Sequence, residues 1–500
     1  METDTWHKLA SELPISAQSF VNGQHVSARS GAVMPTHNPA NGKLLAEVPA
    51  CDAPDVDLAV AAARRAFDRG VWSSRPPSER KRVLLRLAEL ISEHGNELAL
   101  LETLDAGKPI ADTLSVDLPA AASSVAWYAE AIDKIYDDVA PTAGNVVATI
   151  TREPIGVVAA IVPWNFPLLM ACWKVAPALA AGNSVILKPA DLSPLSAIRL
   201  AELAAEAGVP EGVFNVVTGH GSKAGQALGM HMDVDAVSFT GSTAVGKLLM
   251  SYSAQSNMKR VALECGGKSP HIVMNDCRDL DEAARAAAFG IFFNQGEVCC
   301  AGSRLLVQED IKTEFLERVI SIASTLKPGD PLDPDTNLGA LISEEHTRSV
   351  LRHIDNGKSD GANLICGGAQ VLQETGGHFL EPTIFDQVNM SMRLASEEIF
   401  GPVLATLTFR DVDDAVRIAN DTIYGLGAGL WTSDLDTALS VSKRLRAGTV
   451  WINNYDESDI TVPFGGYKQS GIGRDKSLQA LDFYREIKTT WIKFRHHEKA

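Results

Sequence analysis

Between Gly156 and Leu263 the chain alternates short, unbroken apolar runs with longer stretches of helical periodicity. The runs are expected to be strands and lie at Val157–Val162, Ser184–Lys188, Phe214–Thr218, Ala236–Thr240 and Arg260–Leu263. The stretches between them are expected to be helices and lie at Leu168–Ala181, Leu195–Ala207, Ser222–Met230 and Ser242–Ser253. Strands without polar alternation, each followed by a helix, indicate a parallel sheet buried on both faces. The pattern predicts a doubly wound α/β domain of the dinucleotide-binding type.

A second alternation begins after Gly266 and Gly267. Its apolar runs lie at His271–Met274, Arg304–Val307, Val403–Phe409, Gly427–Trp431 and Thr449–Ile452. Its helical patterns lie at Leu280–Gly290, Ile311–Leu326, Asp413–Asn420 and Asp434–Arg446. We therefore expect a second α/β domain, which also agrees with a length of 500 residues, since one hydrophobic core rarely grows that large.

Two further segments have strand patterns. Residues Tyr136–Arg152 alternate weakly around Ala143 and Gly144, which is typical of a projecting hairpin, and Glu486–Phe494 alternates as well. Exposed strands at the margin of a domain usually need a partner. We therefore expect these segments to pair between subunits of a homo-oligomer.

Composition argues against several classes of function. The net charge of −17 repels phosphate backbones, which argues against nucleic-acid binding. The seven cysteines are scattered without zinc-ligand spacing, so neither a disulfide framework nor a metal site is expected, and a reducing, cytoplasmic location is favoured. The apolar stretch Ile155–Trp173 is long enough to cross a membrane, but Gly156, Pro163, Asn165 and Pro167 interrupt it. A strand, a turn and a helix are expected there instead, with no membrane contact.

The segment Phe292–Arg304, FFNQGEVCCAGSR, carries two adjacent cysteines after a turn that contains glycine. An exposed thiolate at such a turn can act as a nucleophile. A free cysteine can equally be a buried core residue. The segment alone leaves both interpretations open, and spacing does not choose between Cys299 and Cys300.

Two other segments offer groups that such a nucleophile would need. Glu264 ends the last strand of the first alternation, where an apolar setting should raise the pKa of its carboxyl and suit it to general-base work. A solvated glutamate at an interdomain hinge is the alternative. Asn165, within PWNFP at 163–167, is a rigid amide donor of the kind that holds an oxyanion. It can also be a turn residue that bonds its own backbone.

Two strand ends have features of a nucleotide site. Residues Phe239–Gly246, FTGSTAVG, are predicted as strand, turn and helix, so N–H groups at the helix start can meet a pyrophosphate. The segment is not G-x-G-x-x-G, so the indication is weak. Lys188 and Asp191 follow another strand, where they would reach a ribose or a phosphate, or be a surface lysine and a loop aspartate.

Together these motifs resemble those of the aldehyde dehydrogenase superfamily over essentially the whole chain. The shared blocks are PWNFP at 163–167, FTGSTAVG at 239–246, ECGGKSP at 264–270, NQGEVCCAG at 294–302, EEIFGPV at 397–403 and PFGGYKQSGIGRD at 463–475. Within the superfamily the chain resembles the bacterial γ-glutamyl-γ-aminobutyraldehyde dehydrogenases of putrescine breakdown. That resemblance rests on WYAEAIDKIY at 127–136, SPLSAIRLAELAAEAG at 193–208 and NNYDESDITVPFGGYKQSG at 453–471.

The resemblance implies an NAD(P)-binding domain at 1–135 and 155–265, a catalytic domain at 266–481 and a small β oligomerisation arm at 136–154 and 482–500. Relatives form dimers and tetramers, and these segments fit either. The implied activity is NAD(P)-dependent oxidation of an aldehyde to the carboxylic acid.

The resemblance also implies a role for each catalytic residue. Cys299 would attack the aldehyde, and Asn165 and the Cys299 N–H would hold the oxyanion. After hydride transfer to the nicotinamide, Glu264 would deprotonate the water that hydrolyses the thioester. Lys174 matches a lysine that relatives use in the proton relay of that glutamate, or is purely structural.

The cofactor implied is NAD, with NADP possible. The residues expected to contact it are Trp164, Lys188, Asp191, Gly221, Gly241, Ser242, Gly246, Glu398 and Phe400. Of these, Glu398 and Phe400 would hold the nicotinamide ribose and flank the ring. Lys188 and Asp191 would contact the adenine ribose, where a carboxylate bonds a 2′-hydroxyl and repels a 2′-phosphate. Many relatives carry glutamate at position 191, and the shorter aspartate leaves room for some use of NADP.

For the substrate tunnel the resemblance implies the positions Ala120, Phe166, Trp173, Phe293 and Ser458. The acidic loop 456–459, which contains Asp456 and Asp459, lies near the predicted mouth of the tunnel. The small side chains of Ala120 and Ser458 suggest a wide tunnel. The carboxylates of Asp456 and Asp459 would attract cationic aldehydes such as aminoaldehydes, or belong to an ordinary solvated loop.

Three other functions remain as alternatives. A broad-specificity aliphatic or betaine aldehyde dehydrogenase is the first. An acyl-CoA-forming relative is the second, although retention of Glu264 as hydrolytic base favours the free acid. A structural protein that has lost the chemistry is the third, and such a protein would tolerate loss of Cys299, Glu264 or Asn165, all of which are present.

Overall fold

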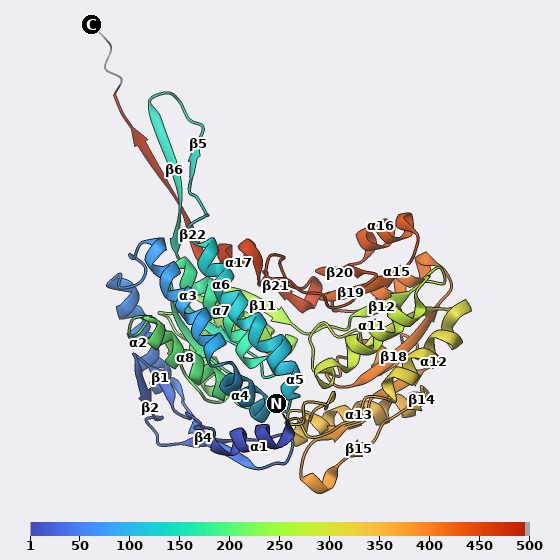
Figure 1. Ribbon diagram of the computed structural model, residues 1–500. Helices are drawn as coiled ribbons and strands as arrows, with labels where there is room; N and C mark the ends of the chain where they lie inside the picture. Colours follow the sequence, from blue (N-terminus) through green and yellow to red (C-terminus); the bar gives the residue numbers. More distant parts are fainter. Residues whose placement is uncertain (1, 496–500) are drawn as a thin grey trace.

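The computed structural model describes residues 2–495. Figure 1 shows two α/β halves side by side and a narrow three-stranded arm that projects from the first half. The first half contains an eight-stranded sheet of order β2-β1-β9-β8-β7-β10-β11-β21, and the second a seven-stranded sheet of order β14-β17-β18-β13-β12-β19-β20. The expected fold class, two doubly wound α/β domains with a small β arm, is confirmed.

The first sheet is built around five parallel strands. They are β7 (Val157–Ile161), β8 (Ser184–Lys188), β9 (Phe214–Val216), β10 (Ala236–Gly241) and β11 (Arg260–Cys265). The helices that follow them are α7 (Pro167–Ala181), α8 (Leu195–Ala207), α9 (Gln226–Met230) and α10 (Thr243–Gln255). Helices α7 and α8 end at Gly182 and Gly208, whose φ angles of 99° and 101° form the left-handed caps that favour glycine.

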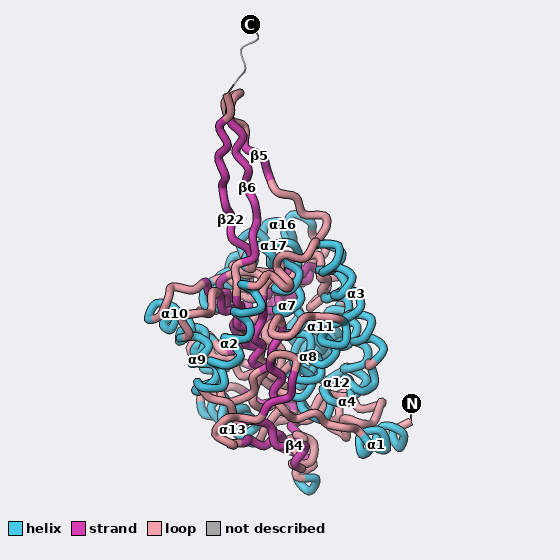
Figure 2. Tube along the Cα trace, turned by 90° about the vertical axis from the view of Figure 1, so that its left-hand side faces the viewer, coloured by secondary structure: helices cyan, strands magenta, loops and turns pink. Residues whose placement is uncertain are grey.

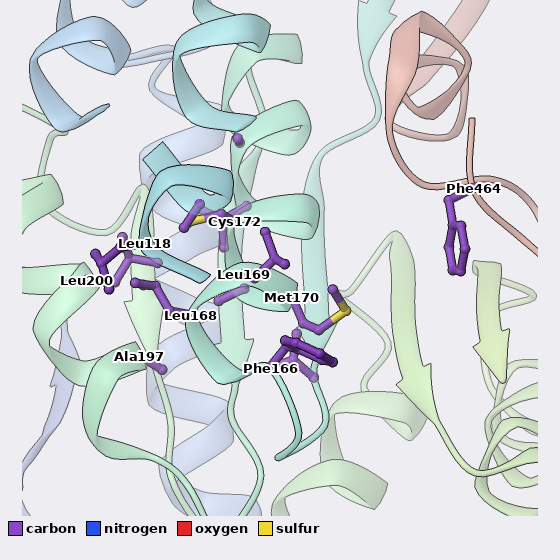
Figure 3. Packing of buried hydrophobic residues seen from close by; sticks show 14 of the residues in the cluster. Leu118, Phe166, Leu168, Leu169, Met170, Cys172, Ala197, Leu200 and Phe464 are labelled. Atoms are coloured by element: carbon purple, nitrogen blue, oxygen red, sulfur yellow. The ribbon is translucent and has the colours of Figure 1, made fainter. Parts of the chain in front are cut away.

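The N-terminal region completes the first half. Its helices are α1 (Thr3–Glu12), α2 (Ala53–Asp68), α3 (Pro77–Glu93), α4 (Gly95–Ala106) and α6 (Leu118–Ala131). Its strands form the antiparallel pairs β1 (Ser19–Val21) with β2 (Gln24–Val26) and β3 (Val33–His37) with β4 (Leu44–Pro49). Helix α6 packs on α7, and Figure 3 shows Leu118, Ala197 and Leu200 on one side of α7 with Phe464 on the other.

The second half has the same layered design. Its strands are β12 (Pro270–Val273), β13 (Arg304–Gln308), β17 (Thr383–Asp386), β18 (Val403–Phe409), β19 (Gly427–Trp431), β20 (Thr449–Ile452) and the antiparallel edge strand β14 (Asn363–Cys366). Its helices are α11 (Leu280–Phe292), α12 (Lys312–Ala323), α13 (Glu344–Ser359), α14 (Arg393–Ser396), α15 (Val412–Asn420) and α16 (Leu435–Arg444). Strands β14 and β17 and helix α13 were not expected from the apolar pattern.

The arm consists of β5 (Asp138–Ala140), β6 (Val146–Pro154) and β22 (Arg485–Lys493) in the order β22-β6-β5. Strands β6 and β22 pair antiparallel over nine residues. The hairpin and the C-terminal strand, expected to pair between subunits, thus pair with each other inside one chain because their ends emerge side by side from the first half (Figures 1 and 2). Among residues 2–495 no strand pairs with the outer edges of β5 and β22. Residues 496–500 of the expected arm lie outside the described residues.

Near its end the chain returns from the second half to the first. Strand β21 (Gly471–Ile472) pairs antiparallel with β11, and α17 (Ser477–Phe483) packs on α7. The approach is close, since a Cβ on Gly471 would lie 2.0 Å from the Leu263 carbonyl oxygen. The expected domain boundary at 481 therefore differs from the sheet boundaries, because residues 471–483 lie on the first half.

Residues 155–173 form β7, a proline-containing turn and the start of α7, as expected. Among residues 2–495 no helix has both the length and the apolar character needed to cross a membrane.

Candidate active site

A cavity of about 470 Å³ opens at the carboxyl ends of β7, β10 and β11, where doubly wound sheets usually bind ligands. Residues from both halves of the molecule line it. It brings together thirteen of the residues that the sequence singled out: Trp164, Asn165, Phe166, Trp173, Gly241, Ser242, Glu264, Phe293, Cys299, Glu398, Phe400, Asp456 and Ser458. One site thus combines a thiol, a carboxylate, an amide donor and a turn before a helix.

A left-handed turn presents Cys299 to this cavity. Asn294, Gln295 and Gly296 have consecutive φ angles of 47°, 56° and 74°. A Cβ on Gly296 would lie 2.3 Å from Gly401 backbone atoms, so the turn requires glycine there. Cys299 is half-buried and lines the cavity. Of the two interpretations of this segment, this position agrees with a thiol presented at a turn and not with a buried core cysteine.

The neighbouring cysteine has a different environment. Cys300 is 4% exposed, and its thiol donates a hydrogen bond to Oδ1 of Asp456 at 3.1 Å. The hydrogen bond with Cys299, burial and the Asp456 charge all raise the pKa of the Cys300 thiol well above its usual value. Cys300 is therefore held as a neutral thiol that acts as a donor.

Glu264 is buried at the end of β11, and its Oε1 has no hydrogen-bond partner among the described residues. Burial and the negative charge of Asp475 raise the pKa of the Glu264 carboxyl well above its usual value, while the positive charge of Lys174 opposes the shift. Lys174 lies beneath the cavity rather than on its lining and donates a hydrogen bond to Asp475. The raised pKa expected from the apolar setting is present, and Asp475 adds to it.

Asn165 is fixed against the cysteine turn. Its Nδ2 donates a hydrogen bond to the Glu297 carbonyl at 2.8 Å, and Asn294 Nδ2 donates to the Asn165 carbonyl at 3.2 Å. Because an amide Nδ2 carries two hydrogens, one remains for a ligand oxygen. The Asn165 side chain is therefore held rigidly by its hydrogen bond to a neighbouring segment. A hydrogen bond to the backbone of its own turn is not needed to explain its position.

The expected cofactor residues that line the cavity include an aromatic group around Trp164 and a carboxylate, that of Glu398. Trp164 packs edge-on against Phe400 and His346, each with a ring-centroid distance of 5.2 Å. Glu398 accepts a hydrogen bond from the Gly267 N–H at Oε1 (3.0 Å), and burial raises the pKa of its carboxyl to about 7. A Cβ on Gly266 would lie 1.9 Å from Glu398 Oε2, so only glycine permits this approach.

This arrangement fits a nicotinamide dinucleotide. No described residue donates a hydrogen bond to Glu398 Oε2, which leaves it to a ribose hydroxyl. The turn Gly241–Ser242 leads from β10 into α10, whose first N–H groups suit a pyrophosphate. Ser242 caps that helix by accepting a hydrogen bond from the Val245 N–H at 3.3 Å.

Four expected cofactor residues lie off the cavity lining. Lys188 is buried, donates a hydrogen bond to the Pro189 carbonyl at 2.7 Å and has a pKa lowered to about 8 by burial. Asp191 lies 3.1 Å from His220 Nδ1, and Gly221 has open space around its Cα. Gly246 has a packing role, because a Cβ there would lie 2.9 Å from Cys265 Sγ.

The substrate side of the cavity is aromatic. Phe166 and Phe293 lie 6.3 Å apart and Trp173 and Phe464 5.7 Å apart, measured between ring centroids. Figure 3 shows Phe166 near the start of α7 and Phe464 on a separate segment. Phe166, Phe464 and Ser458 all line the cavity.

Two expected tunnel residues lie outside the lining. Ala120 is half-buried on α6, and Asp459 is exposed and accepts hydrogen bonds from the N–H and hydroxyl of Thr461. Of the acidic residues in the loop 456–459, Asp456 alone lines the cavity.

Sequence reasoning missed several residues of the site. His346, Phe464 and Asp475 line the cavity, and Lys476 donates a hydrogen bond to Ser458 at 2.7 Å. Phe464 and Asp475 lie in the block at 463–475 that is shared with the resembled superfamily, which was the available indication. His346 lies in a segment without a motif, Lys476 directly follows the block, and both reach the site only through the tertiary fold.

Comparison with known proteins gives consistent matches. The model of the aldehyde dehydrogenase family matches residues 25–490. The NADP/NAD-dependent aldehyde dehydrogenase PuuC of Escherichia coli (strain K12) is 54% identical over 97% of this chain and 98% of its own length. The crystal structure of γ-glutamyl-γ-aminobutyraldehyde dehydrogenase from Burkholderia cenocepacia is 57% identical with a TM-score of 0.97, covering 99% of this chain and 100% of that one. A crystal structure of indole-3-acetaldehyde dehydrogenase in complex with NAD+ is 56% identical with a TM-score of 0.98, over the same shares.

Proposed function

Because the chain belongs to the aldehyde dehydrogenase family, we propose that it oxidises an aminoaldehyde such as γ-glutamyl-γ-aminobutyraldehyde to the carboxylic acid. Its enzyme class, an NAD(P)-dependent aldehyde dehydrogenase, agrees with the motifs in the sequence. The observation that carries the proposal is one cavity lined by Cys299, Glu264, Asn165, Glu398 and Phe400.

In the proposed reaction the Cys299 thiolate attacks the aldehyde carbon and forms a thiohemiacetal. The free hydrogen of Asn165 Nδ2 and the Cys299 N–H stabilise the oxyanion. When bound, the nicotinamide supplies a hydride acceptor, so that the carbon becomes a thioester on Cys299. Glu264 removes a proton from water, which attacks the thioester and releases the acid and the thiolate. Its raised pKa suits this work, because an ionised, poorly solvated carboxylate is a stronger base.

For the cofactor, Glu398 would bind the nicotinamide ribose and Trp164 and Phe400 would form apolar walls. Asp191 would bind the adenine ribose and favour NAD, with NADP accepted as well. Lys188 would add a donor there. None of these residues needs to move a proton during catalysis.

A broad-specificity enzyme is the second candidate. The aromatic lining of Phe166, Trp173, Phe293 and Phe464 favours it, because such a wall binds neutral apolar aldehydes by burial alone. The similarity to an indole-3-acetaldehyde dehydrogenase points the same way.

We also propose a cytoplasmic homo-oligomer, a dimer or a tetramer. The arm leaves the outer edge of β22 unpaired, with Ile487, Trp491 and Ile492 exposed on it, and exposed apolar strand edges usually bind a partner. Light scattering coupled to gel filtration measures the oligomeric mass.

The deciding experiment follows NADH formation with a panel of acylated aminoaldehydes, free aminoaldehydes, aliphatic aldehydes and aromatic aldehydes. The Cys299→Ala variant is the control for non-enzymatic reduction. We expect kcat/KM to be highest for the γ-glutamyl compound. Equal values across the panel would favour the broad-specificity enzyme. A strict requirement for coenzyme A would refute release of the free acid.

A further inference from the structure

Lys476 is a buried cation that the proposed reaction does not use. It directly follows Asp475 and is 2% exposed. Its φ of 64° and the φ of 52° at Ser477 place two successive non-glycine residues in the left-handed region. Such strain persists only where the surroundings hold it, and it clusters at functional sites. Asp475 lines the cavity, whereas Lys476 is not on its lining and contacts it through Ser458, Trp173 and Phe464.

The ammonium of Lys476 lies against three residues that line the cavity. It donates a hydrogen bond to Ser458 Oγ at 2.7 Å and lies 5.3 Å from the Trp173 ring centroid and 5.9 Å from that of Phe464. Among residues 2–495, Ser458 is the one acceptor it has. Two of its three protons therefore remain for a ligand or for water.

The charged groups around this ammonium are all acidic. Burial lowers the pKa of Lys476, and the nearby charges of Asp459 and Asp456 oppose that shift without forming an ion pair with it. Asp456 lines the cavity as well, and burial raises the pKa of its carboxyl to about 6, so it is largely ionised at neutral pH. The cavity wall thus carries the Asp456 carboxylate, with the Lys476 ammonium bonded to the lining residue Ser458, rather than the purely acidic entrance expected from the loop sequence.

We propose that Lys476 is a specificity-determining residue that binds a carboxylate at the far end of the aldehyde, while Asp456 attracts an ammonium group beside it. A γ-glutamyl group carries both an α-carboxylate and an α-ammonium, so its zwitterionic end matches this pair. Charge-assisted hydrogen bonds are strong where water is largely excluded, as beside Trp173 and Phe464. The inference rests on the proposed function, in which the aldehyde carbon lies at Cys299.

The test compares three amides of γ-aminobutyraldehyde that share one reacting end. The γ-glutamyl amide carries a carboxylate and an ammonium, the glutaryl amide a carboxylate alone, and the acetyl amide neither. We expect Lys476→Met to lower kcat/KM about tenfold or more for the two carboxylate-bearing amides, mainly through KM, and less than about twofold for the acetyl amide. Lys476→Arg keeps the charge and should restore part of the loss.

The outcomes separate a specificity role from a structural one. An equal loss for all three amides would mean that Lys476 only holds the Ser458 loop, and no loss for any would mean that it does not bind the substrate. Either result overturns the inference. A wild-type enzyme that oxidises the glutaryl and acetyl amides but not the γ-glutamyl amide would refute the proposed substrate. In that case the glutaryl compound still tests Lys476.

Discussion

The Lys174 ammonium donates a hydrogen bond to the Asp475 carboxylate, although the two residues are 301 positions apart in the chain. Both side chains are buried, and both act on Glu264. The negative charge of Asp475 raises the pKa of Glu264, and the positive charge of Lys174 lowers it. Burial is the largest cause of the raised pKa of Glu264, and the two charges of the ion pair adjust that pKa in opposite directions.

In the Lys174→Met variant, the acid limb of the pH–rate profile for thioester hydrolysis should shift to higher pH by about one unit or more. Without the lysine charge the pKa of Glu264 rises further, so a higher pH is needed to ionise it. The measurement is single-turnover hydrolysis of the acyl-enzyme across a pH series. Lys174→Arg is the matched control and should retain the wild-type profile. An unshifted limb in Lys174→Met would assign Lys174 to structure alone.

Replacing Asp456 or Asp459 of the acidic loop by asparagine should have different effects on the KM for a cationic aldehyde. Asp456→Asn should raise KM for a cationic aminoaldehyde about threefold to tenfold at low salt, because Asp456 lines the cavity. Asp459→Asn should change it less, since that carboxylate is exposed and bonded to Thr461. The Asp456 effect should fade below pH 6, where its carboxyl is protonated in the wild type.

Steady-state kinetics with a neutral aldehyde of equal length supply the comparison. A KM change of the same size for the neutral aldehyde would mean that the loop acts through shape instead of charge. Because Asp456 also accepts a hydrogen bond from Cys300, circular dichroism of Asp456→Asn should be checked against the wild type.

Much of the fold could be predicted because the central strands are buried on both faces. Strands such as β7 and β8 consist of continuous apolar residues, and Gly182 and Gly208 mark the ends of the following helices. Edge strand β14 has an exposed or half-buried pattern that resembles a loop, and it was missed. Helices α2, α3, α4 and α6 follow one another with no strand between them to mark their ends.

The site was predictable where a motif adjoins a recognisable element. Asn165 follows β7, Glu264 lies near the end of β11, and Cys299 lies in the turn between α11 and β13; all three line one cavity. Lys476 could not be found in this way, since its role depends on a strained backbone and on a contact with Ser458. No local pattern in a sequence encodes such a contact, because it arises only when the chain returns to the first half.

A second buried ion pair supports the wall of the cavity. Lys108 and Asp117 are 1% and 0% exposed and form a hydrogen-bonded salt bridge, and the Lys108 ammonium lies 3.7 Å from the Phe166 ring centroid. Lys108→Met leaves the Asp117 charge buried without a partner, which should cost about 3–5 kcal/mol of unfolding free energy.

Chemical denaturation of Lys108→Met and of the double variant Lys108→Met with Asp117→Leu measures this cost. The double variant removes both charges and should recover most of the lost stability. Equal destabilisation of the single and double variants would mean that packing around Phe166, not the unpaired charge, accounts for the loss.

The adjacent cysteines should respond in opposite ways to substitution. Cys299→Ala should lower NADH formation on the order of 10³-fold or more, because no other thiol on the cavity is available as a nucleophile. Cys300→Ala should retain most activity, since the Cys300 thiol is buried, donates to Asp456 and has a raised pKa. Mass spectrometry after brief treatment with iodoacetamide should find the alkyl group on Cys299, and cofactor-binding affinity should match the wild type in both variants. Activity that survives in Cys299→Ala and disappears in Cys300→Ala would transfer the nucleophile to Cys300, and the left-handed turn at 294–296 would then need another explanation.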